Sequence, residues 1–429
     1  MTLADVPMLF ILAGLIAYVT LAGPDFGAAV WQVTAGRGKE SERLRDLAHD
    51  AMAPVWEANH VWLIFVLTVM WTSYPTAFGS IASTLCVALF IAGLGIVVRG
   101  AAYALRSGAG DLHEQVRIDA ASAVSSILTP FALGAAIGGV ASGRVPVGNA
   151  AGDLITSWIN PTSLITGAIA VAASAYLAAV FLSADAIRLD QPDLSEAFRR
   201  RALGSGVVAG ILAAAGLVVL HDDAYRIYHG LVSGDGLPAL IVSALAGVGT
   251  LALVVLRRYE PARYSAGLAV AAIVVGWALA QKPELLPGLT VHQAAASHDT
   301  LWAVIIAVIA GGLIVFPSLA LLFRLTLLGT LRGAHGPGHV AAEPAATAPP
   351  RPGPRALVDA ATQGLLARVA VACLVVGFGF LSVLDAGWAH AIGVVALFAF
   401  IVVGFFAALP RDLGVERPES STEAQGSGP

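Results

Sequence analysis

Long apolar stretches recur along this chain, and short polar segments separate them. About 20 apolar residues are enough for a helix to cross the hydrocarbon core of a bilayer. Nine such stretches fit before residue 325: 7–33, 54–74, 77–98, 120–142, 161–184, 204–220, 239–256, 265–281 and 299–322. The pattern therefore predicts an all-α, polytopic membrane protein with a nine-helix transmembrane bundle in residues 1–325.

The sequence changes character after the ninth stretch. Residues 326–360 are rich in proline, glycine and alanine, which is typical of a flexible linker, here expected in the cytoplasm. Residues 361–410 contain two more apolar runs, 366–385 and 389–408, and predict an extra transmembrane hairpin. The final segment, 411–429, is polar, and we expect it to be disordered.

The overall composition excludes a soluble globular protein. The 429 residues are 57% hydrophobic and 12% charged, with a mean hydropathy of +0.80, whereas soluble domains carry about 25% charged residues. The first apolar run lacks a basic leader and is too long for a signal peptide, so we expect it to remain as a span. Cys86 and Cys373 lie in apolar runs and are expected to be buried packing thiols.

Basic residues are concentrated in alternate loops. Of the 24 lysines and arginines, the even-numbered loops hold only three, Arg144, Arg226 and Lys282, and the rest lie in the odd-numbered loops or the C-terminal part. Loops rich in lysine and arginine tend to stay in the cytoplasm. We therefore expect the N-terminus outside, and the odd-numbered loops and the C-terminus in the cytoplasm.

Four polar residues lie at membrane depth in the first two apolar stretches. Asp25 follows a Gly-Pro step that interrupts helical hydrogen bonding, and Glu57, Asn59 and His60 open the second stretch. Because a short basic loop joins the two stretches, they are expected to be antiparallel neighbours, with these residues toward the cytoplasmic side. A carboxyl group in hydrocarbon has to stay protonated, find a partner or face water.

Spacing alone leaves two interpretations of these residues open. In one, Asp25 caps the kink and Glu57 extends to the membrane interface, as acids at helix ends often do. In the other, they form a cytoplasmic entrance for protons or cations, with Glu57 and His60 one turn apart on one face and Asn59 about 100° from His60. A lone histidine beside a carboxyl group is more often a hydrogen-bonding partner than a haem ligand.

The two polar motifs together resemble a known family. Gly23-Pro-Asp-Phe-Gly27, the basic loop and Ala53-Pro-Val-Trp-Glu-Ala-Asn-His-Val-Trp-Leu63 are similar to subunit II of the cytochrome bd-type quinol oxidases, and the likeness extends over the nine stretches. Some relatives carry aspartate in place of Glu57 or glutamine in place of His60. The histidine resembles the branch described as cyanide-insensitive.

The resemblance implies a respiratory quinol:oxygen oxidoreductase of the bacterial plasma membrane that is not active without its partner. It implies that haems b and d and the quinol site belong to subunit I, and that this chain binds no cofactor or metal itself. By position, Glu57 is the principal proton-relay residue and Asp25 is its companion. Asn59 and His60 belong to the same hydrogen-bonded proton pathway. The extra hairpin covers a lipid-facing groove, replaces a small accessory subunit or is an addition of this species.

An ion-coupled secondary transporter is the alternative, since broken helices and acids at membrane depth occur there too. A transporter is expected to have two related halves and several polar residues near the membrane midplane, and the sequence has few deep polar groups. A third alternative, a purely structural membrane scaffold, would give Glu57 no function.

Overall fold

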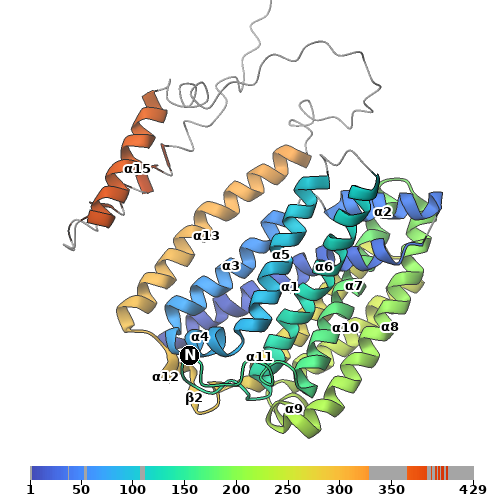
Figure 1. Ribbon diagram of the computed structural model, residues 1–429, viewed down its shortest axis with the longest axis horizontal. Coiled ribbons are helices and arrows are strands. Elements are labelled where there is room, and N and C mark those ends of the chain that lie inside the picture. The colour runs from blue at the N-terminus through green and yellow to red at the C-terminus, as the bar shows by residue number, and fades with distance from the viewer. Residues whose placement is uncertain are drawn as a thin grey trace, which may run out of the picture. The chain divides into compact units, whose positions relative to one another are not determined.

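The computed structural model of this chain describes residues 2–36, 38–52, 56–106, 112–327 and 365–383, and a few positions between 388 and 403. The chain divides into two compact units, Met1–Leu328 and Gly329–Pro429. The first unit is a bundle of long helices (Figure 1). The second contains α15 (Leu365–Val383), while most of the expected linker and hairpin return and the whole 411–429 tail lie outside the described residues.

The long helices of the first unit coincide with the expected apolar stretches. They are α1 (Val6–Val33), α3 (Trp56–Ser73), α5 (Cys86–Arg106), α6 (Leu112–Ala141), α7 (Pro161–Arg188), α8 (Pro192–Asp223), α10 (Leu237–Val255), α11 (Tyr259–Gln281) and α13 (His298–Leu327). Within the described chain, eight helices are long and apolar enough to cross a membrane, and α3 adds a shorter apolar helix, Ala58–Ser73. The all-α membrane class is confirmed, whereas the described residues do not establish nine spans plus a hairpin.

Shorter elements lie between the long helices. The third apolar stretch is interrupted at Leu85, where α4 (Pro75–Thr84) ends and α5 begins. The other short elements are η1 (Leu3–Asp5), α2 (Lys39–Met52), α9 (Tyr225–Val232), β1 (Glu284–Leu286), β2 (Leu289–Thr290) and α12 (Val291–Ala294). β1 and β2 form an antiparallel pair. The expectation for the cysteines is wrong for Cys86, because its side chain is exposed.

The two ends of the bundle differ in charge. The N-terminus, α4, α9 and α12 gather at one end and α2 lies at the other, which we call the basic end (Figure 1). Ion pairs at the basic end join α2, α7, α8 and α11 and the loops between them: Arg43–Asp193 at 2.5 Å, Arg188–Glu260 at 2.9 Å and Arg257–Glu196 at 3.2 Å. At the opposite end Arg144 pairs with Asp223 at 2.6 Å. The basic residues of several odd-numbered loops therefore meet in one place.

The basic loop after α1 is more structured than the sequence predicted. Its residues form the amphipathic helix α2, which buries Leu44, Leu47 and Ala48 against Leu194 and Phe198. A helix with one apolar stripe has to bury that stripe against another element. The loop is therefore attached to α8 by an apolar contact as well as by the Arg43 ion pair.

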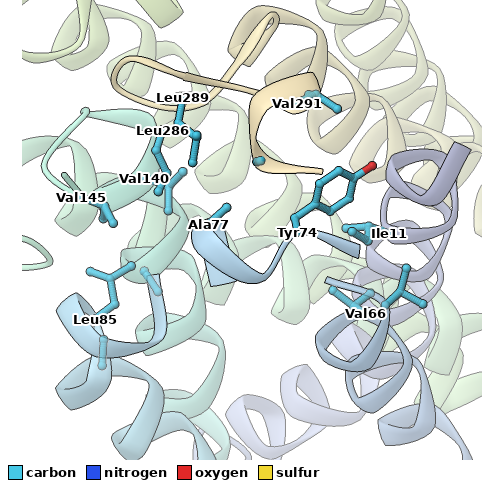
Figure 2. Packing of buried hydrophobic residues seen from close by; sticks show 14 residues of the cluster. Ile11, Val66, Tyr74, Ala77, Leu85, Val140, Val145, Leu286, Leu289 and Val291 are labelled. Atoms are coloured by element: carbon cyan, nitrogen blue, oxygen red, sulfur yellow. The ribbon is translucent and has the colours of Figure 1, made fainter. Parts of the chain in front are cut away.

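An apolar core fixes the helices at the end opposite α2. Ile11 on α1 and Val66 on α3 pack beside Tyr74, and the β-hairpin contributes Leu286 and Leu289 (Figure 2). Tyr74 is fully buried, and its hydroxyl donates a hydrogen bond to the carbonyl of Ala4 at 2.5 Å. This core holds α1 and α3 together at their far ends, which leaves their polar segments side by side toward the basic end.

Helix α1 lies between α3 and α7 and touches both closely. A Cβ added at Gly14 would lie 2.7 Å from Cγ2 of Val66, and one added at Gly27 would lie 1.9 Å from the carbonyl oxygen of Ser174. The indole nitrogen of Trp31 also donates to the carbonyl of Ala175 at 2.9 Å. Only glycine permits the backbones of α1 and α7 to approach this closely.

Candidate functional site

Asp25 is the buried acid at the centre of the candidate site. It lies on α1 and is 1% exposed, and its Oδ2 accepts a hydrogen bond from Nδ2 of Asn59 on α3 at 2.8 Å. The same amide donates to the carbonyl of Leu21 at 3.0 Å, beside the point where Pro24 interrupts the backbone ladder of α1. The expected antiparallel pairing of the two helices therefore brings Asp25 and Asn59 into direct contact.

Three buried polar atoms around this pair have no hydrogen-bond partner among the described residues. They are Oδ1 of Asp25, the hydroxyl of Tyr18 on α1 and Nη1 of Arg99 on α5. Arg99 and Tyr18 interact electrostatically with Asp25. Buried polar groups in proteins are nearly always satisfied, and ordered water or a partner supplies what the chain itself does not. The arrangement suits a site that takes up water or protons.

Aromatic rings enclose His60 beside the acid. His60 is 9% exposed, and its ring meets Tyr18 edge-on at a centroid distance of 6.0 Å and Phe26 at 5.6 Å. The guanidinium of Arg99 lies over the same Phe26 ring at 4.8 Å. The expected site residues Asp25, Asn59 and His60 therefore share one buried cluster between α1, α3 and α5.

Glu57 belongs to the first turn of α3, two residues before Asn59. Its side chain, like that of Trp56, lies outside the described residues. The structure therefore brings three of the four expected residues together and gives the backbone position of the fourth.

Tyr18 and Arg99 were not among the residues expected at this site. Because the third stretch was expected to end at residue 98, its boundary placed Arg99 in the following basic loop. That boundary is wrong: α5 continues to Arg106, so Arg99 lies within the helix and is half-buried. The guanidinium is stabilised there by the Phe26 ring. Tyr18 lies seven residues before Asp25, a spacing that places both on the same face of α1, and this spacing could have revealed it.

Within the described part of the chain, no group of three or more histidine, cysteine, aspartate or glutamate side chains is arranged to hold a metal ion. The cluster combines a buried acid, an amide, an imidazole and a phenol on adjoining apolar helices. A carboxyl group and an imidazole accept and release protons, and ionisable residues inside a membrane commonly mark a pathway for protons or ions.

The fold and the cluster together define a helical membrane protein with a buried ionisable site, and comparisons identify its family. A family model described as cytochrome bd terminal oxidase subunit II matches residues 3–326. The chain therefore belongs to the family of subunit II of the cytochrome bd terminal oxidases, components of an oxidoreductase complex of the bacterial membrane.

Two relatives agree with this family. A protein of Bacillus subtilis (strain 168), named "Putative cytochrome bd menaquinol oxidase subunit II", is 22% identical over 245 residues, which cover 54% of this chain and 67% of that protein. A chain in the structure of bd oxidase from Geobacillus thermodenitrificans superposes with a TM-score of 0.61 at 25% identity, over 76% of this chain and 99% of that one. The resemblance inferred from the two motifs is confirmed, and the family takes the place of the transporter alternative.

Proposed function

We propose that this chain conducts protons from the cytoplasm toward oxygen reduction on the haem-bearing subunit I of a quinol:oxygen oxidoreductase. The observation that carries the proposal is the buried Asp25 carboxyl group, which is held by Asn59 on one oxygen and has no partner within the described chain on the other. A relay group needs such a combination, because it has to be fixed in place and still be able to exchange a proton.

The order of residues along α1 and α3 supports a proton pathway that begins at the basic end. Glu57 opens α3 at the basic end, and Asp25 lies eight residues before the end of α1, about 12 Å inside the bundle. Tyr18 lies about 10 Å further along α1, and His60 contacts its ring. The proposed sequence is therefore Glu57, then Asp25 with Asn59, then His60 and Tyr18.

The proposed direction of proton movement follows from the position of the basic residues. Arginines of the odd-numbered loops meet at the basic end, and such loops tend to remain in the cytoplasm. The N-terminus and the β-hairpin then face outward. Protons taken from the inside for water formation, with quinol protons released outside, would store about 2.3 kcal/mol per charge at 100 mV.

We assign haems b and d and the quinol site to subunit I. A haem needs open space beside its axial ligand, whereas the His60 ring has Tyr18 and Phe26 within 6.0 Å. The name of the Bacillus subtilis relative refers to a menaquinol, which supports a quinol as the electron donor here. Membrane lipid surrounds the complex, and α15 belongs to a C-terminal unit that we propose acts as an accessory to it.

The test uses the purified complex with Glu57→Gln and Asp25→Asn, and Glu42→Gln as a control because Glu42 is an exposed acid on α2. We expect the haem spectrum to persist in all three, and quinol oxidation to fall about 100-fold or more in the two relay variants and to stay unchanged in the control. Unchanged turnover and proton uptake in Asp25→Asn and Glu57→Gln across the pH range would contradict the proposal.

A further inference from the structure

An open apolar groove follows α8 from the basic end toward the middle of the bundle. Its volume is about 640 Å³, and helices α1, α6, α7 and α8 line it. Most of the lining is aliphatic or aromatic, and its one charged residue, Arg201, lies toward the basic end of α8. The lining includes Val30, Trp31, Ile127, Phe131, Arg201 and Leu212. The groove is separate from the Asp25 cluster, whose polar residues are not in its lining.

The length of the groove matches one leaflet of a bilayer. Along α8 its lining runs from Arg201 to Leu212, which at the rise of an α-helix is about 16 Å. Half of the hydrocarbon core of a bilayer measures about 15 Å. A single acyl chain entering beside Arg201 would therefore end near the membrane midplane, where the groove ends.

Small residues on α7 and α8 provide the space of the groove. Ala168, Ala172 and Ala175 line the groove from α7, and Gly204 lines it from α8. A Cβ added at Gly204 would meet no atom within 4 Å, whereas one added at Gly206, on another side of the helix, would lie 2.6 Å from Leu251. The side of α8 at Gly204 therefore faces open space.

The position of Arg201 gives the groove a cationic end. Nη1 of Arg201 donates to the carbonyl of Ala197 at 3.1 Å, and its guanidinium lies 5.7 Å from the centre of the Phe198 ring. Arg200 beside it is exposed, while Arg199 is paired with Glu196 at 2.8 Å. Guanidinium groups match phosphate oxygens in charge and geometry, and basic sites between membrane helices bind anionic headgroups.

We propose that this groove binds one acyl chain of an anionic phospholipid, with the lipid phosphate at Arg201. The chain fills the space beside Gly204 and covers the apolar side chains that the helices leave open. In the orientation proposed above, the lipid belongs to the cytoplasmic leaflet.

The experiment measures lipid retained by the purified oxidase complex. The complex is incubated with an equal mixture of phosphatidylglycerol and phosphatidylcholine, and bound lipid is counted by native mass spectrometry. Gly204→Leu places a side chain in the groove, since a Cβ there meets no atom within 4 Å, and Gly210→Leu is the matched control, because Gly210 is also on α8, has the same open space at its Cβ position and does not line the groove. Leucine is a better helix former than glycine, so neither change weakens α8.

We expect wild type and Gly210→Leu to retain phosphatidylglycerol equally, and Gly204→Leu to retain about tenfold less because the buried methylene contacts are lost. Arg201→Gln should still bind lipid but prefer phosphatidylglycerol about fivefold less, the effect of one cation near a lipid surface. Equal retention in Gly204→Leu, an unchanged preference in Arg201→Gln, or a prenylated quinone as the molecule lost from Gly204→Leu would overturn the proposal. If Gly204→Leu does not assemble, the preference of Arg201→Gln decides.

Discussion

Asn59 on α3 donates a hydrogen bond to Asp25 on α1 across 2.8 Å, and it is the side chain that joins the two halves of the sequence motif. The same amide satisfies the carbonyl of Leu21. One residue thus holds both the acid and the backbone beside Pro24. The contact makes Asn59 a positioning residue in the proposed pathway.

Replacing Asn59 by leucine is expected to destabilise the complex by about 1–3 kcal/mol, because the buried carboxyl group and the carbonyl of Leu21 both lose a donor. Thermal unfolding of the purified complex measures this. Combining Asn59→Leu with Asp25→Leu should cost less than the sum of the two single changes, because the double variant leaves no unpaired carboxyl group. Simple additivity would mean that the two side chains do not interact.

Replacing Gly27 by alanine tests the contact between α1 and α7. The added Cβ would lie 1.9 Å from the carbonyl oxygen of Ser174, so one helix has to move. We expect a loss of stability of about 1–3 kcal/mol or more and a lower yield of assembled complex. Gly93→Ala is the control, since a Cβ there meets nothing within 4 Å. Equal yields of the two variants would contradict the close packing.

The ion pair at the end opposite α2 is expected to hold α6, α7 and α8 together. Asp223 accepts hydrogen bonds from both Arg144 and the hydroxyl of Thr162. Asp223→Asn should lower the unfolding free energy by about 1–2 kcal/mol. Its neighbour Asp222 is 76% exposed, so Asp222→Asn should change it by less than about 0.5 kcal/mol. If Asp222→Asn lowered the unfolding free energy more than Asp223→Asn, a structural role for the Arg144–Asp223 pair would be excluded.

Removing the C-terminal unit tests whether it is accessory. The first 328 residues form a compact unit of their own, so a chain ending at Leu328 should still insert, assemble and give a complex with the haem spectrum and quinol oxidase activity within about twofold of wild type. Loss of haem d absorption from the truncated complex would instead give the C-terminal unit a part in the catalytic core.

The sequence predicted the spans well and the spaces between them poorly. Apolar length is a local property, so it located every long helix in the part of the chain that the structure describes. It missed α2 because that segment is charged along its length and buries only a narrow apolar stripe, including Leu44 and Leu47, against helices far away in the sequence. It also began the sixth stretch at 204, whereas α8 begins at Pro192 and continues through polar residues that lie beyond the apolar run.

The candidate site was predictable in part, because some of its residues stand out within a single apolar stretch. Asp25, Asn59 and His60 stand out because polar residues are costly inside apolar helices. Arg99 did not, because its burial depends on how far α5 continues and on the Phe26 ring from α1. The groove beside Gly204 was not predictable at all, since it arises where the alanines of α7 and Gly204 of α8 leave space between larger side chains of α1 and α6.

Gly27 lies about 200° around α1 from Asp25, so the contact with Ser174 braces the helix from behind the acid. The direction in which the carboxyl group points is thereby set by α7, a helix that contributes no residue to the proposed pathway. Substitutions in α7 would then change the geometry of the proposed proton pathway without changing any of its acidic residues.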